Sequence, residues 1–328
     1  MYINVKNAVQ SMKYLQGDKK HMINNWVSYK NGNYMVSIDL DTGTKIRENN
    51  LDFFKADTAE SIDVKITNNC DMGCAQCHEN STPDGKHGEL FNHKWLDTLH
   101  PYCELAIGGG NPLAHPQLEE FLRICKEKKA IPSMTVNQIH FEKDFDRIKK
   151  LCDDKLIYGL GISLMKVTDD FIKKVKQIPT AVIHVINGIH TVPQLFNLAN
   201  NDLKVLILGY KEVRRGIKNY EDNKDKIDFT KTQLYENLPD IINQDWFNVV
   251  SFDNLSLKQL EVKRLLSDAE WNQFYMGDDG IDGQQTSATF YIDLVEGVFA
   301  KNSCSMIRYP IKDTVEEMYQ FLRDLKED

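Results

Sequence analysis

The residues with the clearest chemical potential are three cysteines close together in the chain. Cys70, Cys74 and Cys77 are spaced CxxxCxxC and directly follow a strand-like apolar run at 62–66. Thiolates select zinc, copper(I) or iron–sulfur clusters. Structural zinc sites and cubane iron–sulfur clusters both normally take four protein ligands. A loop with three thiols therefore favours a cluster with one iron left open, and a zinc loop or unconnected buried thiols are the alternatives.

The other cysteines do not form a second group. Cys125 falls in the apolar pattern of an expected helix, while Cys103, Cys152 and Cys304 are scattered along the chain. The sequence has 7 cysteines in all, and its first residues contain no apolar secretory core. We therefore expect reduced cytoplasmic thiols and a single cluster.

Composition sets broad bounds on the class of protein. A chain of 328 residues can form one large α/β domain with appendages, or two domains. The formal charge of −8 argues against non-specific wrapping of duplex nucleic acid, although a local basic cleft would be compatible with it. No apolar run approaches the length of a membrane span. We expect a cytoplasmic chain with no membrane partner.

The elements that must position the cysteines follow an alternating pattern. Residues 59–255 repeat a strand-then-helix rhythm, which predicts an α/β fold with a parallel sheet. Sites in such sheets lie at the carboxyl ends of the strands, where the cysteine loop falls. The predicted strands are 62–66, 105–107, 133–136, 159–164, 181–186, 204–208 and 249–252, and two of the predicted helices are 116–128 and 169–177.

The segment before this core, residues 1–58, predicts a small appendage. Alternating apolar and polar residues surround Asn31 and Gly32, a strong hairpin-turn signal. A second turn is predicted at 41–43. We expect a short amphipathic helix followed by a three-stranded β-meander, which serves as a structural cap.

The segment after the core, residues 256–328, predicts an α+β capping extension. Its expected elements are a helix at 258–266, a loop at 274–285 that includes Asp278 and Asp279, a hairpin around Glu296 and Gly297, and a final helix at 313–325. The two aspartates could bind a cation, or they belong to a plain surface loop. Just before this segment, we expect the charged run at 220–228 to be a solvent-facing loop or helix end.

The cysteine spacing and the strand rhythm resemble the radical S-adenosylmethionine (SAM) superfamily. The resemblance implies a partial (β/α)6 barrel over residues 59–255, with Cys70, Cys74 and Cys77 ligating one 4Fe-4S cluster. In that family the open iron binds SAM, and reductive cleavage gives a 5′-deoxyadenosyl radical that abstracts hydrogen from a substrate. An electron donor such as a flavodoxin or ferredoxin is also implied. The segments CHENSTPDGKHG and GGGNPLAHP are similar to an uncharacterised radical SAM group of phages and bacteria.

A glycine-rich turn follows the second predicted strand. It consists of Gly108, Gly109, Gly110, Asn111 and Pro112, and glycines let a backbone approach a ligand closely. The family commonly has GGEP here, where the glutamate binds the amino group of SAM. Asn111 replaces that glutamate, and its amide oxygen can accept from an ammonium only without charge assistance. The resemblance implies that SAM lies across this turn.

The ends of the later strands match further family positions. Asn137 matches the strand end near the substrate, and Ser163 matches the serine that meets the ribose hydroxyls. Asn187 and Gly209 end the fifth and sixth predicted strands, where the resemblance implies contacts to the adenine. Because parallel strands end at one edge of a sheet, we expect these residues to share one site.

Charged residues complete the expected site. Lys211, Arg214 and Arg215 follow the sixth predicted strand. Family members often use a basic residue to pair with the SAM carboxylate or with an anionic substrate, and a solvated positive patch is the alternative. His78 could tune the cluster through a sulfide or contact the substrate, or it could simply pack. Glu79 could bind the substrate or the SAM amino group, in place of the glutamate missing at position 111.

These motifs do not identify the substrate. We favour a peptide or protein side chain, because the two flanking segments could hold an extended partner, and a strand-adding peptide would need an exposed edge of the meander. A nucleotide or modified base would instead need a basic or aromatic pocket near Arg214, Arg215, Tyr210 and Tyr275. A non-catalytic adaptor that holds zinc or a cluster is the third hypothesis. The departures from the family pattern at Gln76 and Asn111 leave that hypothesis open.

Overall fold

The computed structural model describes residues 25–51, 54–275 and 287–325. The amphipathic helix expected before the meander, and Asp278 and Asp279 of the expected loop, lie outside these residues. Within the described ranges, no helix combines the length and the apolar character needed to span a membrane.

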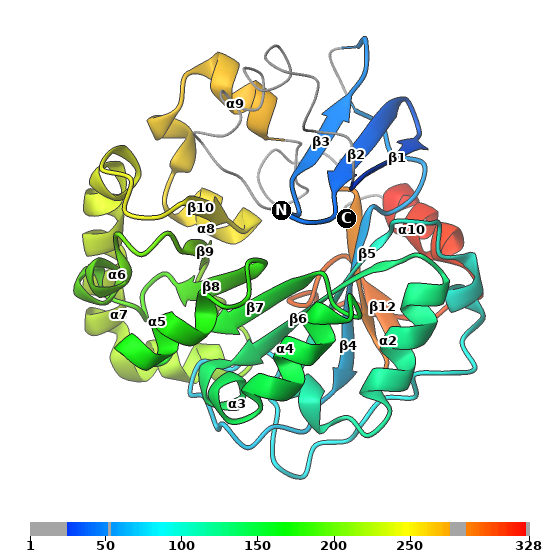
Figure 1. Cartoon of the computed structure of the whole chain (residues 1–328), viewed down its shortest axis with the longest axis horizontal. Helices are drawn as coiled ribbons and strands as arrows, with labels where there is room; N and C mark the ends of the chain where they lie inside the picture. Colours follow the sequence, from blue (N-terminus) through cyan, green and yellow to red (C-terminus); the bar gives the residue numbers. More distant parts are fainter. Residues whose placement is uncertain (1–24, 52–53, 276–286, 326–328) are drawn as a thin grey trace.

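A ten-stranded sheet forms the centre of the molecule (Figure 1). Seven strands pair parallel in chain order: β4 (Ser61–Thr67), β5 (Glu104–Gly109), β6 (Ile131–Asn137), β7 (Gly159–Ser163), β8 (Ala181–Ile186), β9 (Lys204–Leu208) and β10 (Val249–Phe252). Each of them lies where the sequence predicts a strand. The seven strands predicted over residues 59–255 therefore form one parallel series.

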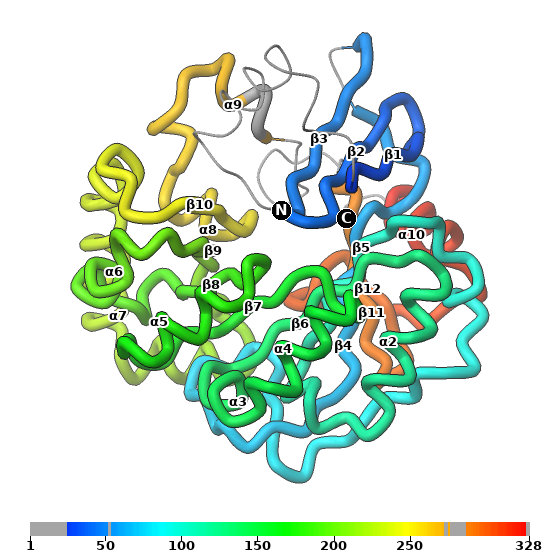
Figure 2. Tube along the Cα trace, viewed as in Figure 1, coloured from blue at the N-terminus to red at the C-terminus, as the bar shows by residue number. Residues whose placement is uncertain are grey.

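The predicted capping extension continues the same sheet. β11 (Thr289–Asp293) pairs parallel with β4, and β12 (Val298–Ala300) and β13 (Tyr309–Pro310) follow antiparallel. The expected hairpin around Glu296 and Gly297 is thus confirmed. Figure 2 shows β11 and β12 beside β4, although more than 200 residues separate them in the chain (Ser61 pairs with Thr289). Residues from the tail therefore reach the strand that leads into the cysteine loop.

Helices connect the strands and form an outer layer (Figure 1). The α-helices are α2 (Leu118–Glu127), α3 (Gln138–Lys143), α4 (Phe145–Asp153), α5 (Asp169–Val175), α6 (Val192–Leu198), α7 (Arg215–Asn243), α8 (Asn254–Gln259), α9 (Asp268–Phe274) and α10 (Val315–Asp324). The 3-10 helices are η1 (Lys94–Thr98), η2 (Pro112–Ala114) and η3 (Val262–Leu265). The predicted helices at 116–128, 169–177 and 313–325 correspond to α2, α5 and α10.

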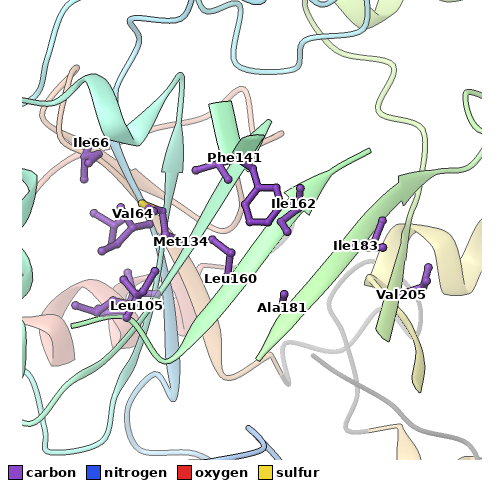
Figure 3. Packing of buried hydrophobic residues seen from close by; sticks show 14 of the residues in the cluster. Val64, Ile66, Leu105, Met134, Phe141, Leu160, Ile162, Ala181, Ile183 and Val205 are labelled. Atoms are coloured by element: carbon purple, nitrogen blue, oxygen red, sulfur yellow. The ribbon is translucent and has the colours of Figure 1, made fainter. Parts of the chain in front are cut away.

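Alternate residues of the strands build the main core. Val64, Leu105 and Ile162 are almost fully buried and belong to one apolar cluster (Figure 3). Because strand side chains alternate between faces, the other face of β4 carries Asp63, Lys65 and Thr67. The inner face of the sheet is therefore polar next to the cysteine loop.

One helical prediction is partly right and another is wrong. The charged run at 220–228 is mostly exposed, as expected, but it lies inside α7, which is kinked at Asn223 and buries Ile227 and Leu234 on one face. That apolar stripe outweighs the local charge pattern. The helix expected at 258–266 is split into α8 and η3, because Glu261 has a left-handed backbone with φ of 47°.

The N-terminal meander is confirmed, with strands β1 (Trp26–Asn31), β2 (Tyr34–Asp39) and β3 (Lys45–Glu48). Its first turn consists of Gly32 and Asn33, one residue later than the predicted Asn31–Gly32. Gly32 has φ of +57°, and a Cβ there would lie 1.8 Å from the Lys55 carbonyl oxygen. The left-handed backbone and the close contact explain why glycine occupies this position.

The meander packs at the amino ends of the central strands. Ile131, the first residue of β6, belongs to the apolar cluster of the meander. Arg47 Nη2 lies 2.6 Å from Glu60 Oε2, next to the start of β4. The cysteine loop leaves β4 at its other end, so the meander and the cysteine loop lie at opposite ends of this strand.

Candidate active site at the carboxyl ends of the strands

The three predicted cluster ligands lie on one loop that closes on itself after β4. Cys70 N donates to Thr82 O at 2.8 Å, and Cys77 N donates to Cys74 O at 3.2 Å. The three side chains are partly buried and form no disulfide. Burial raises the pKa of Cys70 and of Cys74, and negative charge on Cys77 raises both further. Cys70 and Cys74 are thus close enough to Cys77 to feel its charge.

This donor set suits a cluster better than a single ion. No group of three or more His, Cys, Asp or Glu side chains in the described ranges is arranged to hold one metal ion. A cubane cluster instead binds each cysteine to a different iron, and its net charge favours thiolates over thiols. The three thiols on the loop are compatible with a cubane that keeps one iron free of protein.

The glycine-rich turn lies directly against the segment that leads to Cys70. Gly110 N donates to Thr67 O at 2.7 Å. Gly109 has φ of +109°, and a Cβ there would lie 2.3 Å from Thr67 O. A Cβ on Gly110 would lie 2.3 Å from Asn69 O, whereas one on Gly108 would meet nothing within 4 Å. The turn is therefore fixed on the side of the cysteine loop and open at Gly108, as a ligand lying across it requires.

Two predicted ligand residues act as helix caps. Asn111 Oδ1 accepts from Leu113 N at 3.2 Å, and Asn137 Oδ1 accepts from Ile139 N at 2.9 Å. Each amide oxygen thus satisfies the first turn of a helix, η2 or α3. The cofactor contacts that the resemblance implies for Asn111 and Asn137 stay predictions.

Glu79 is the centre of a buried network of charges. Lys65 Nζ lies 3.1 Å from Glu79 Oε2 and 3.3 Å from Asp293 Oδ2, and Arg308 Nη1 lies 3.0 Å from Asp293 Oδ2. Tyr291 OH donates to Glu79 Oε2 at 3.3 Å. Burial alone would raise the pKa of Glu79, but His78 and Lys65 more than offset it and hold that pKa well below its usual range. The network joins the cysteine loop to the tail strand β11.

The two arginines after β9 bind the backbone of the cysteine loop. Arg214 Nη1 donates to His78 O and lies 3.8 Å from Glu79 Oε2. Arg215 Nη2 donates to Ser81 O. Both guanidinium groups are therefore engaged by the loop instead of forming a solvated positive patch. Their observed contacts position the loop. The ligand contacts that the resemblance implies for a basic residue here stay predictions.

His78 and Lys211 lie beside this network. His78 Nε2 is 3.3 Å from Glu79 Oε1, and burial and the charge of Lys211 lower the pKa of His78, which favours the neutral imidazole. Lys211 Nζ donates to Ser303 Oγ at 3.2 Å, across to the tail. Lys211 forms no ion pair with a carboxylate among the described residues, so its ammonium could meet an anionic group of a ligand.

The ends of β7, β8 and β9 form a second group of predicted residues. Ser163 pairs in register with Asn137 of β6 and with His184 of β8. Asn187 Nδ2 donates to Gln259 Oε1 at 3.2 Å. Gly209 N donates to the Asp253 side chain at 2.9 Å. Ser163, Asn187 and Gly209 therefore lie at the carboxyl edge of the sheet, as predicted.

Gln259 is a site residue that the sequence did not reveal. Its Oε1 accepts from Tyr210 N at 2.9 Å, and its Nε2 donates to Tyr210 O at 2.9 Å. It also binds Asn187, whose own Oδ1 is buried without a hydrogen-bond partner in the described structure. The α8 residue Gln259 thus fixes the backbone after β9 and leaves one acceptor on Asn187 unsatisfied.

Four charged or polar residues of the Glu79 network were also missed: Lys65, Tyr291, Asp293 and Arg308. Lys65 did carry a signal, because a lysine within a strand of a parallel sheet, which is normally buried on both faces, needs a partner. The other three lie in the tail, and no local pattern connects them with the cysteine loop.

Comparisons with known proteins show the fold. The sequence matches no family model and no curated protein. Among solved structures, Streptococcus suis SuiB bound to S-adenosylmethionine matches with a TM-score of 0.59 and 13% identity, covering 92% of this chain and 89% of SuiB. SuiB bound to the precursor peptide SuiA matches with a TM-score of 0.53 and 14% identity, covering 83% and 68%. A further SuiB structure matches with a TM-score of 0.57 and 12% identity, covering 92% of this chain and 90% of SuiB.

These matches show that this chain shares the fold of SuiB. The α/β architecture with its large parallel sheet fits that fold. At 12% to 14% identity, the similarity concerns the fold and leaves the reaction to be argued from the site.

Proposed function

We propose that this chain is a radical SAM enzyme with one 4Fe-4S cluster, held by Cys70, Cys74 and Cys77. The observation that carries the proposal is the joining of the cysteine loop to the Gly109–Gly110 turn by backbone hydrogen bonds at the carboxyl ends of β4 and β5. A three-thiol loop beside an open glycine turn is what a cluster with a free iron and a bound SAM would need.

When bound, SAM and the reduced cluster would supply a 5′-deoxyadenosyl radical that abstracts hydrogen from the substrate. The chain's own residues have positioning roles in this proposal. Gly108 leaves room for the ligand, and Lys211 offers an ammonium to its carboxylate. Ser163, Asn187 and Gly209 lie where the ribose and adenine would be held, and the unsatisfied Asn187 Oδ1 could accept from an amino group.

Glu79 has a positioning role rather than the predicted role as a free acceptor. Lys65 and Tyr291 already occupy its oxygens, and Arg214 approaches the same carboxylate. The network instead fixes the loop after Cys77. A fixed loop keeps the three thiols in one arrangement before iron arrives, which lowers the entropy lost on cluster binding.

For the substrate, we propose a peptide or protein side chain. SuiB, which shares the fold, has been solved with the precursor peptide SuiA. A flavodoxin or ferredoxin would supply the electron. A nucleotide or modified base remains the alternative substrate. The charge of the ligand that binds next to Asp63 would distinguish a peptide from a nucleotide.

The test is reconstitution of the full chain with iron and sulfide without oxygen, followed by dithionite and SAM. We expect 5′-deoxyadenosine from the wild type and none from Cys74→Ala. Cys152→Ala is the matched control, because Cys152 is partly buried on α4 and outside the loop. It should bind about four irons per chain and form product as the wild type does.

Zinc that occupies the loop and cannot be replaced by iron would contradict the proposal. It would support the adaptor hypothesis. Product that persists in Cys74→Ala would contradict the assignment of the cysteine ligands.

A further inference from the structure

Asp63 is a carboxylate on the inner face of the sheet that the proposed function does not use. It lies two residues before Lys65 on β4, and its neighbours Ile62 and Val64 point to the apolar core. Its side chain is exposed, although it belongs to a central strand with β5 on one side and β11 on the other. The side chain of Asp63 therefore lies on the inner face of the sheet, opposite the apolar core.

Small residues surround Asp63 along one side of the sheet. Asp63 pairs in register with Ala106, Ala106 pairs with Ser133, and Ser133 pairs with Gly159. Ala106, Ser133 and Gly159 are only partly buried. Gly108 lies two residues after Ala106 on the same face of β5, and a Cβ there would meet nothing within 4 Å. This row leaves space beside the carboxylate that leads toward the glycine turn.

Asp63 has no bonded partner among the described residues: neither a hydrogen bond nor an ion pair engages its carboxylate. Lys65 is paired with Glu79 and Asp293. Lys211 donates to the neutral hydroxyl of Ser303 and forms no ion pair with Asp63. Desolvation raises the pKa of Asp63, and the charge of Lys211 only partly offsets that effect. A carboxylate that has neither a hydrogen bond nor an ion pair is open to a cationic group of a ligand, which would offset the cost of removing it from water.

We propose that Asp63 binds a positively charged group of the substrate, the ammonium or guanidinium of a lysine or arginine side chain that enters the barrel. This inference rests on the proposed function and makes its substrate class more specific. A nucleotide would bring phosphate, and an unpartnered carboxylate repels phosphate. The charge at Asp63 thus favours a basic peptide over the nucleotide alternative at this position.

The test compares the binding of two capped amino acids to the reconstituted full chain. Their backbones carry no charge, and their side chains are similar in length. Nα-acetyl-lysine N-methylamide carries the ammonium, and Nα-acetyl-norleucine N-methylamide lacks it. Ligand-observed NMR titration measures both dissociation constants without SAM or reductant. We expect the lysine probe to bind the wild type at least about tenfold more tightly, the effect of one charge-assisted hydrogen bond.

Three variants sharpen the comparison. Asp63→Asn keeps the shape but removes the charge, and should abolish the preference for the lysine probe. Asp63→Glu keeps the charge and should retain a preference. Asp146→Asn is the matched control on the exposed surface of α4, and should behave as the wild type. Circular dichroism melts confirm that each variant is folded.

Equal binding of the two probes by the wild type would overturn the inference. So would an unchanged preference in folded Asp63→Asn, or tighter binding of guanosine 5′-monophosphate than of the lysine probe. The result is separable from the proposed function, because probe binding needs no radical chemistry. A chain that cleaves SAM but shows no preference contradicts only this inference, whereas a chain that shows the preference but never cleaves SAM contradicts only the proposed function.

Discussion

Lys65 allows two buried carboxylates to exist within a few ångströms of the cysteine loop. Its ammonium lies 3.1 Å from Glu79 and 3.3 Å from Asp293, and all three side chains are at most 6% exposed. Buried ion pairs add little net stability, but removal of one partner leaves the others as uncompensated charges. At the residue scale, we therefore expect the removal of any one of these three charges to destabilise the fold around the cysteine loop.

Replacement of Lys65 by methionine, which has a similar shape and no charge, should lower the free energy of unfolding by about 3–5 kcal/mol. Urea denaturation measures this change. Lys94→Met is the matched control, because the Lys94–Asp313 pair is mostly exposed and should be almost neutral. A loss for Lys65→Met no larger than that of the control would show that the network does not hold the loop.

At the scale of elements, the glycine turn and the cysteine loop behave as one unit. Gly110 N and Asn111 N donate to the backbone of residues 67–69, and isolated bridges join Thr67 to His87 and Asn69 to Thr82. The returning segment is therefore tied to both the strand end and the turn. Glycine is needed where the backbones of the strand end, the glycine turn and the cysteine loop come into close contact, because a Cβ would not fit there.

We expect Gly109→Ala to lower the stability of the fold and Gly108→Ala to lower only the affinity for SAM. Gly109→Ala places a Cβ 2.3 Å from Thr67 O at φ of +109°, and should cost about 1–3 kcal/mol of stability. Gly108→Ala meets no protein atom within 4 Å, so its melting temperature should match the wild type while its affinity for SAM falls. Unfolding curves and SAM titrations measure both. Equal effects of the two substitutions would contradict the open face assigned to Gly108.

At the scale of the whole molecule, one carboxylate joins the meander to the central sheet. Glu60 is 1% exposed, and contacts Arg47 at 2.6 Å and Lys45 at 3.3 Å. Tyr34 OH also donates to it at 2.5 Å. Burial alone would raise the pKa of Glu60, but Lys45 and Arg47 lower it to about 2. The meander is therefore held at the end of β4 opposite the cysteine loop.

The stability that Glu60 contributes should depend on pH in one direction. Its folded pKa is depressed from 4.5 to about 2, so the contribution is complete above about pH 4.5 and is lost as the pH falls toward 2. Glu60→Gln should cost on the order of 3 kcal/mol at pH 7, and its difference from the wild type should shrink with acidification. Glu48→Gln, at the exposed end of β3, should show no such trend. Urea titrations between pH 7 and pH 3 would reveal a constant difference if the assignment is wrong.

The sequence by itself determined the strands of the central sheet and the place of the cysteine loop. Apolar runs such as residues 181–186 predict buried strands because their pattern reflects burial, which is a local property of the chain. The CxxxCxxC spacing and the glycine turn are local as well. Predictions failed where tertiary packing decided the conformation, as at Glu261, where a left-handed residue splits the expected helix.

Only the tertiary structure decided which charges meet. Lys65 forms ion pairs with both Glu79 and Asp293, and Asp293 also pairs with Arg308. Arg214 donates a hydrogen bond to the carbonyl oxygen of His78. These residues come from three separated parts of the chain, and periodicity reports which face of an element is polar but not which distant element faces it. The unpartnered carboxylate of Asp63 emerged in the same way, because only the pairing of β4 with β5 and β11 places it in the middle of the inner face of the sheet.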